Sequence, residues 1–451
     1  MLQATSSLKS KFDGFDRFAL HLHTPAHQGM GPQVSLLSKD LLYLDSPYIT
    51  RCDLKPLEAK VSEYYGTEHT FVLTAGASQG LLTTLITLGR THQRVWVQRN
   101  CHKSVIGGLI LAGLEPVFLA PKERILSVQD LNAAFAEFSE KAPTCIILTN
   151  PTYEGWGCDL ETCIAACRAQ GLTVVVDEAH GSLWPATSLL PQSAIALGAD
   201  LVVHSLHKYC GAIVQSALVH LPKGSRIAVE DFQSALELVE TTSKSNLILL
   251  SIEETLDQMF SALLGDRLIL QLAKLEQIRN RITSSDGVLK LMEPDCSVRD
   301  PLKLFVASDK ANPAQLVRYF ADLGVDYELY DTEGVLFIFS IYHSDADLDL
   351  FEAAMDSVIQ RIGQEKSESL SGKIPHYNQP HMKLSPRSAH HHPSGFETIP
   401  LSQAMGRIAG EMVASCPPGW PLVIPGEVLG DWHRETLGNN FKVKVLREAL
   451  S

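Results

Sequence analysis

The chain lacks an apolar run long enough to cross a membrane, and its first residues lack the pattern of a signal peptide. It also lacks positive charge, because 38 Lys and Arg stand against 51 Asp and Glu, a net charge of −13. That balance excludes a surface built to bind nucleic acid or anionic lipid. Its nine cysteines form no paired CxxC ladder, and no internal repeat is present. We therefore expect a cytoplasmic protein with reduced thiols.

Three of the cysteines are close together. Cys158, Cys163 and Cys167 recur near helical spacing, which fits either a metal site or the buried face of a helix. We favour the helix face and expect no metal.

The chain does contain material for a large core, with 451 residues of which 45% are hydrophobic. From about residue 54, short apolar strands alternate with helical segments, which predicts an α/β fold with a mostly parallel sheet covered on both faces. A long amphipathic helix is expected from about 247 to 282, and another from 402 to 415. We expect five segments: an N-terminal arm (1–53), a large domain (54–286), a small α+β domain (287–363), an exposed linker (364–399) and a C-terminal unit (400–451).

Two of the expected strands end in residues that could do chemistry together. Lys208 follows the strand Leu201–Val203, and Asp177 follows Val174–Val176. A lysine placed in an interior can serve as an amine that holds an aldehyde cofactor as an imine. An aspartate facing a pyridine nitrogen is the usual partner, which points to pyridoxal phosphate (PLP). A surface lysine in a loop is the alternative, and the pairing with Asp177 favours PLP.

Further candidates lie at other strand and helix ends. The small residues 74–80 precede a helix and could seat an anion, or could simply cap the helix. The hydroxyl-rich residues 241–245 leave the same two alternatives open. His102 follows the strand Arg94–Val97 and could stack on a flat cofactor. The loop around His27 is shaped by proline and glycine, and we expect it to approach a ligand or a partner subunit.

With these motifs assembled, the chain resembles the ornithine/lysine/arginine decarboxylases of the PLP-dependent aspartate-aminotransferase fold (fold type I) from about His23 to Glu427. The block Cys101-His102-Lys103-Ser104 and the late Pro425-Gly426-Glu427 are specific to this group. The remaining matching motifs are Thr-Pro-Ala-His-Gln-Gly, Ala-Gly-Ala-Ser, Pro-Thr-Tyr-Glu-Gly, Asp-Glu-Ala-His-Gly, Ser-Leu-His-Lys and Thr-Thr-Ser.

The resemblance implies a seven-stranded large domain, a smaller C-terminal domain and a role for each matched residue. Lys208 would form the internal aldimine, Asp177 would pair with the pyridinium nitrogen, and His102 would stack on the ring. The other implied cofactor contacts are Gly76, Ala77, Ser78, Ala179, His180, Ser205, His207 and, for the partner subunit's phosphate, Thr242. Glu427 and His27 would contact the substrate.

The implied reaction is decarboxylation of lysine, arginine or ornithine to cadaverine, agmatine or putrescine and CO₂, and the sequence leaves the choice open. The chain departs from the family pattern at Gln28, at Val214 and at 244–246 (Lys-Ser-Asn), which bears on specificity. A short form without an N-terminal wing domain is expected, as a homodimer or tetramer. The alternatives are another fold type I enzyme, such as an aminotransferase or lyase, or a silent regulatory homologue.

Overall fold

The computed structural model describes residues 20, 22, 54–121, 124–138, 142–261, 263–293, 298–364, 378–415 and 419–447. Its centre is a seven-stranded sheet in the order β1-β8-β7-β6-β4-β2-β3. The strands are β1 (His69–Leu73), β2 (Arg94–Gln98), β3 (Glu115–Leu119), β4 (Cys145–Thr149), β6 (Thr173–Asp177), β7 (Leu201–Ser205) and β8 (Ala217–Leu221). The five strands from β7 to β3 run parallel, and β8 is antiparallel to both β7 and β1. The predicted mostly parallel sheet is confirmed.

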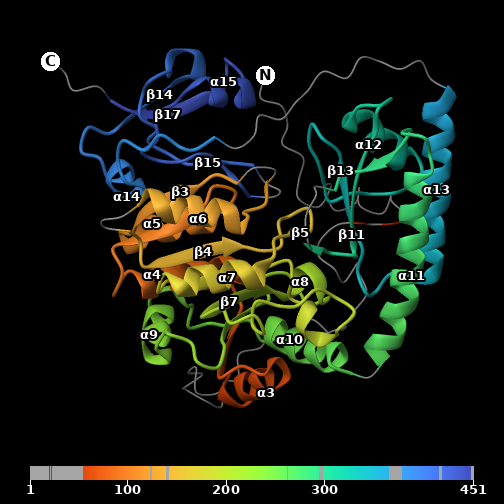
Figure 1. The fold of residues 1–451 in the computed structure, drawn as a ribbon, viewed down its shortest axis with the longest axis horizontal. Helices are drawn as coiled ribbons and strands as arrows, with labels where there is room; N and C mark the ends of the chain where they lie inside the picture. The colour runs from red at the N-terminus through yellow and green to blue at the C-terminus, as the bar shows by residue number, and fades with distance from the viewer. Residues whose placement is uncertain are drawn as a thin grey trace.

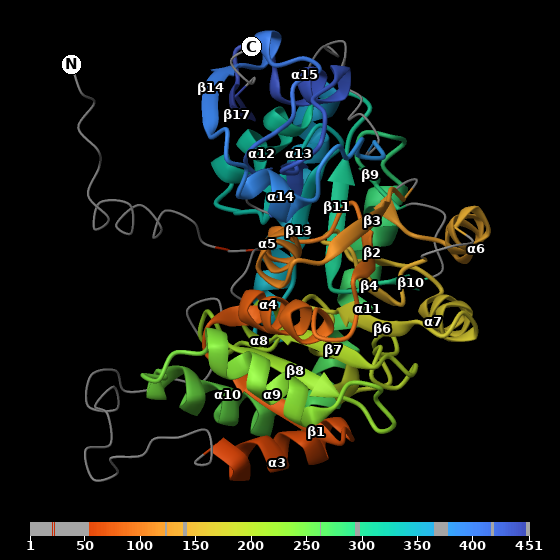
Figure 2. The same ribbon diagram turned by 90° about the vertical axis from the view of Figure 1, so that its left-hand side faces the viewer.

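Helices cover both faces of this sheet (Figures 1 and 2). One face packs on α4 (Gly76–Leu88), α5 (Lys103–Ala112) and α9 (Val229–Val239), and the other packs on α6 (Val128–Glu137) and α7 (Leu160–Ala169). Successive strand residues alternate between the two cores: Val95 and Val97 face α4 and α5, whereas Trp96 faces the opposite side. Cys163 and Cys167 lie on the buried face of α7.

Five further short elements belong to this domain. They are α3 (Lys55–Tyr65), β5 (Trp156–Gly157), the 3₁₀ turn η4 (Trp184–Ala186), α8 (Leu206–Tyr209) and α10 (Asn246–Met259). The single helix expected from 247 to 282 is wrong, because α10 ends at Met259 and α11 (Leu263–Thr283) begins after a turn. Phe260 stacks on Tyr64 at 4.8 Å between ring centroids, and this contact lies at the turn.

The small domain holds a four-stranded antiparallel sheet in the order β12-β13-β11-β9. Its elements are β9 (Lys290–Leu291), β10 (Val298–Arg299), β11 (Lys303–Ala307), α12 (Pro313–Asp322), β12 (Leu329–Tyr330), β13 (Val335–Ile338) and α13 (Asp345–Gln364). Strand β10 pairs instead with β5 of the large domain. From the N-terminal arm, Leu20 pairs with Val325 and Leu22 accepts a backbone hydrogen bond from Ile338.

The C-terminal unit contains α14 (Pro386–His390), β14 (Phe396–Pro400), η5 (Leu401–Gln403), β15 (Val413–Ala414), β16 (Pro421–Val423), α15 (Asp431–Leu437) and β17 (Lys442–Leu446). Residues 378–399 are therefore not an exposed linker. The Arg387 guanidinium donates hydrogen bonds to the carbonyls of Ile110 and Leu111 and so fastens α14 to the end of α5.

The helix expected over 402–415 is also wrong. Its apolar spacing resembles that of a helix, but Gly406 and Gly410 weaken one. Gly406 adopts φ +77°, and Ala409 bridges to Val445. Of the helices that the structure describes, none is long and apolar enough to cross a membrane.

Candidate active site

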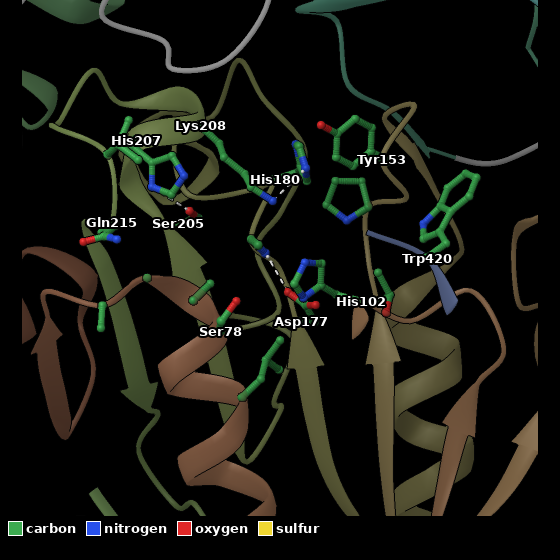
Figure 3. Close-up of a pocket in the computed structure, with 18 of the residues that line it drawn as sticks. Ser78, His102, Tyr153, Asp177, His180, Ser205, His207, Lys208, Gln215 and Trp420 are labelled. Atoms are coloured by element: carbon green, nitrogen blue, oxygen red, sulfur yellow. Dashed lines mark hydrogen bonds between the residues drawn. The ribbon is translucent and has the colours of Figure 1, made fainter. Parts of the chain in front are cut away.

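A cavity of about 320 Å³ opens at the carboxyl ends of the parallel strands (Figure 3). Ligands of open α/β sheets bind at this edge. Its walls come from the start of α4, from the ends of β2, β4, β6 and β7, and from the C-terminal unit. The lining residues are Ala75, Gly76, Ala77, Ser78, Leu81, Asn100, His102, Thr149, Pro151, Tyr153, Asp177, Ala179, His180, Ser205, His207, Lys208, Val214, Gln215 and Trp420.

The first turn of α4 presents backbone N–H groups to this cavity. The cap residue Ala75 makes no side-chain cap hydrogen bond, and Gly76 adopts φ +79° so that its N–H donates to the Gln215 carbonyl at 2.8 Å. Ala77 and Ser78 follow in the first turn and line the wall. Uncapped N–H groups and the helix dipole favour an anion here. Ser205 and His207 lie on the same side, with Ser205 Oγ 3.1 Å from His207 Nδ1.

Lys208 stands on the short helix α8 directly after β7, with its Nζ in the cavity. Nζ lies 3.0 Å from Nε2 of His180 and 5.7 Å from the centroid of the Tyr153 ring. Burial lowers the pKa of Lys208 below its usual value, and the charges of Asp177 and Glu328 oppose that shift. A lysine with a lowered pKa has a larger fraction of the neutral amine, which is the nucleophilic form.

Asp177 ends β6 at the floor of the cavity. Burial raises the pKa of its carboxyl, whereas the Lys208 charge and the Ala179 N–H, which donates to Oδ1 at 3.2 Å, lower it. A cation placed in the cavity would lower this pKa further and keep the carboxylate charged. Thr149 lies beside it, in register on the neighbouring strand β4.

His102 caps the start of α5 and turns its ring toward the cavity. Its Nδ1 accepts the Ser104 N–H at 3.2 Å. Burial, followed by the charges of Lys208 and Lys103, lowers the pKa of His102 to about 3. The ring is therefore neutral at physiological pH, and Figure 3 shows it beside Asp177.

These features fit a flat pyridine that carries an aldehyde and a phosphate. The cavity supplies an aromatic ring, an uncapped helix start, a buried carboxylate and an amine. Two buried oxygens on its wall, Asn100 Oδ1 and Thr149 Oγ1, have no hydrogen-bond partner among the described residues. Buried polar atoms are normally satisfied, so these two indicate a polar ligand at this wall.

Two of the expected site residues lie elsewhere in this chain. Glu427 is fully buried outside the cavity, where its Oε1 lies 2.9 Å from His433 Nε2, accepts the Ile424 N–H at 2.8 Å and lies 4.0 Å from Arg99. Thr242 is exposed in the loop between α9 and α10. A third, His27, and the departure at Gln28 lie outside the described residues.

Sequence reasoning missed several residues at or behind the cavity wall. Tyr153, Trp420, Asn100 and Thr149 line it. Tyr153 lies inside the motif Pro-Thr-Tyr-Glu-Gly, Asn100 and Thr149 lie one or two residues before a recognised motif, and Trp420 lies five residues before Pro425. Lys303 was missed for another reason. It begins β11 in the small domain, where a lysine before an apolar run is typical of a solvated strand end, yet it is only 3% exposed. No local signal in the sequence distinguishes it from a surface lysine.

The comparisons with known proteins agree with this geometry. Residues 35–331 match the family described as Orn/Lys/Arg decarboxylase, major domain, and residues 372–442 match Orn/Lys/Arg decarboxylase, C-terminal domain. The chain belongs to the Orn/Lys/Arg decarboxylase family. It is accordingly a carboxy-lyase that acts on basic amino acids with pyridoxal phosphate as its cofactor, which sets aside the aminotransferase and silent-homologue alternatives.

Named proteins similar to this family member include an arginine decarboxylase of Bacillus anthracis, 28% identical over 94% of this chain and 91% of the relative. The constitutive lysine decarboxylase of Escherichia coli K12 is 24% identical over 84% of this chain and 66% of the relative. A solved structure of the E. coli constitutive lysine decarboxylase superposes with a TM-score of 0.70 at 18% identity, over 91% of this chain and 75% of that one. This likeness confirms the predicted fold type I architecture with its smaller C-terminal domain.

Proposed function

We propose that this decarboxylase converts arginine to agmatine and CO₂, with Lys208 as the residue that binds the cofactor covalently. The observation that carries the chemistry is that Asp177 ends β6, that Lys208 follows the neighbouring strand β7 on α8, and that both face one cavity. The choice of arginine draws on the relatives from Bacillus anthracis and Bacillus subtilis, which are named arginine decarboxylases and align along about nine-tenths of their own lengths. Lysine is the second candidate, because other relatives are named lysine decarboxylases.

Each wall of the cavity then has a task. When bound, the cofactor supplies the electron sink that makes loss of the carboxyl group possible. Asp177 would stabilise a positive charge on the cofactor at the floor of the cavity. The neutral ring of His102 would provide a flat face without adding charge. The first turn of α4, together with Ser205 and His207, would bind the phosphate of the cofactor. Ala179, which lines the same cavity, would contact the cofactor ring.

Proton handling falls to Lys208. With the substrate bound, the amine of Lys208 would be free and in contact with His180 Nε2. From there it can hold a proton and return it to the substrate's α-carbon after CO₂ has left.

For the distal cation of the substrate we propose Glu328 rather than Glu427. The hydroxyl of Tyr153, a residue of the cavity wall, donates a hydrogen bond to Glu328 Oε1. The Glu328 charge acts on Lys208, which places this carboxylate within electrostatic reach of the amine. Glu427 is buried against Arg99 and His433 and is not among the described residues that line this cavity.

We further propose a homodimer in which the exposed loop that carries Thr242 reaches the phosphate of the partner's cofactor. A mixing experiment tests this role. Subunits with Lys208→Ala are expected to be inactive and subunits with Thr242→Ala weakly active, and a re-dimerised mixture is expected to regain activity. No gain from mixing would place Thr242 outside the partner's site. Analytical ultracentrifugation distinguishes a dimer from a tetramer. A cytoplasmic location stays a prediction from the sequence.

The assignment is tested by incubating the PLP-loaded protein separately with arginine, lysine and ornithine and identifying the amine products. Agmatine is expected, and Lys208→Ala is expected to abolish both product and the absorbance band of covalently held cofactor. Cadaverine in place of agmatine would transfer the assignment to lysine. An unchanged cofactor band in Lys208→Ala would remove Lys208 from its proposed role.

A further inference from the structure

Behind the cavity, one histidine lies between the buried Lys303 and the half-buried Lys208. Lys303 extends from the small domain, where its Nζ donates to the Tyr153 carbonyl at 2.8 Å and lies 3.1 Å from Nδ1 of His180. The other ring nitrogen of His180, Nε2, lies 3.0 Å from Nζ of Lys208. Lys208 and His180 point toward one another in Figure 3, and Lys303 reaches the same imidazole from its other edge.

Counting hydrogens limits the charge that this arrangement can hold. A neutral imidazole has one N–H donor and one acceptor nitrogen, whereas an ammonium group only donates. If Lys303 is charged, it donates to Nδ1, and Nε2 then carries the hydrogen and donates to a neutral Lys208. If Lys208 is charged, every role is reversed. Two charged lysines would require two acceptor nitrogens on one ring, so the geometry accommodates one ammonium group.

Protonation of both nitrogens of the His180 ring does not raise this limit on the charge. Burial, and then the charges of Lys208 and Lys303, lower the pKa of His180 well below its usual value. The imidazole therefore stays neutral and passes a proton only by taking one on one nitrogen while giving one up from the other.

Carboxylates act on both lysines, so either can hold the single charge. The groups whose charges act on Lys303 are the carboxylates Asp300, Glu154 and Glu328 and the amine of Lys208. The centroid of the Tyr209 ring lies 5.5 Å from its Nζ, and Tyr209 donates to Asp300 Oδ2 at 2.6 Å. Burial lowers the pKa of Lys303 to about 8, with Asp300 opposing this shift and the charge of Lys208 adding to it. Lys208 faces Asp177 and Glu328, and Asp177 is the carboxylate that the cofactor would engage.

We propose that Lys303 and Lys208 share one proton through His180, so that Lys303 is the positioning residue that lets Lys208 lose its proton. A proton on Lys208 passes to His180 Nε2 while the hydrogen on Nδ1 passes to Lys303. The freed lone pair of Lys208 then forms a bond to the aldehyde carbon of the cofactor, and the aldehyde oxygen leaves as water. This inference rests on the proposed role of Lys208.

The test measures capture of PLP by the apoprotein rather than turnover. Capture is followed by stopped-flow absorbance from pH 6 to 10, and borohydride reduction with mass spectrometry confirms that the adduct is on Lys208. Lys303→Met removes the second amine that can hold the shared proton, and removing a like-charged group raises the pKa of Lys208. We expect the pH profile of capture to move up by about one unit, and capture at pH 7 to slow about tenfold. The matched control is Lys290→Met. Lys290 lies on the neighbouring strand β9, where its exposed side chain pairs with Asp309. This control should reproduce the wild-type profile.

Two results would overturn the proposal: a wild-type profile in folded Lys303→Met, or loss of capture at every pH, which would indicate a merely structural role. Lys303→Met alone could fail to fold because Asp300 loses its neighbouring cation. In that case the double variant Lys303→Met/Asp300→Asn removes both charges, and its pH profile of capture should show the same upward shift. His180→Gln interrupts the path from the ring itself and is expected to remove the dependence of capture on residue 303. A wild-type protein without an adduct on Lys208 is a different result, because it would reject the proposed attachment site.

Discussion

Gly419 lies directly against the imidazole of His102, so close that a methyl group at this position would come within 2.7 Å of ring atoms Cδ2 and Nε2. The Gly419 carbonyl also accepts the Lys103 N–H at 2.8 Å. The C-terminal unit thus contacts the His102 ring from a position 317 residues later in the sequence, the difference between 419 and 102.

Gly419→Ala is therefore expected to displace the His102 ring and to weaken PLP binding by about tenfold, equivalent to about 1.4 kcal/mol. Gly406→Ala is the matched control, because Gly406 has a similar positive φ but open space around it. Both variants should lose about 1–2 kcal/mol of stability from backbone strain. Equilibrium titration with PLP separates them. Equal affinities would show that the contact does not position the ring.

Glu328→Gln and Glu427→Gln form a second matched pair. Loss of a charge-assisted contact to the substrate's distal cation costs about 1.5–3 kcal/mol, so Glu328→Gln should lower kcat/KM roughly 10- to 100-fold. Glu427→Gln weakens a buried contact with Arg99 and His433 and should lower the melting temperature while leaving KM unchanged. Steady-state kinetics and thermal unfolding measure both. The reverse outcome would return the distal contact to Glu427.

Asp177→Asn tests the floor of the cavity. The amide is nearly isosteric but uncharged, so capture of PLP on Lys208 should persist while the charge stabilisation is lost. Decarboxylation should fall by about 100-fold or more, the usual loss when an electrostatic stabiliser is removed. Single-turnover kinetics of the PLP-loaded variant measure the rate of decarboxylation. Undiminished turnover would show that Asp177 does not carry this task.

Three buried histidines predict that acid destabilises the apoprotein. The pKa of His102 lies at about 3, and burial holds those of His180 and His220 well below their usual value. Unfolded histidine titrates near 6.5, so the unfolded state binds more protons below that pH. The free energy of unfolding should then fall from pH 6.5 to pH 5, by about 1.4 kcal/mol per unit for each histidine.

Urea unfolding at pH 7, 6 and 5 checks this slope. His220→Gln, which removes one of the three, should make it shallower, and His69→Gln at the exposed start of β1 should leave it unchanged. A flat stability profile over this range would show that the buried rings bind protons without unfolding.

How much the sequence could predict depends on how far each signal extends along the chain. Asp177 and Lys208 each end an apolar strand, and parallel strands bring such ends together, so both the sheet and this pair could be predicted. Lys303 could not, because its burial depends on how a separate sheet meets Tyr153 and His180. Glu427 lies in a recognisable motif, but the motif does not reveal that Arg99 is its partner. The helix expected over 402–415 failed since spacing alone cannot report the pairing of Ala409 with Val445.

The residues of the cavity wall are synthesised at widely separated times. Trp420 lies on it together with Lys208, although 212 residues separate the two in the chain. During synthesis the amine, the carboxylate and the first turn of α4 emerge long before the aromatic wall does. The cavity is therefore complete only in a polypeptide whose C-terminal unit has been synthesised and has docked.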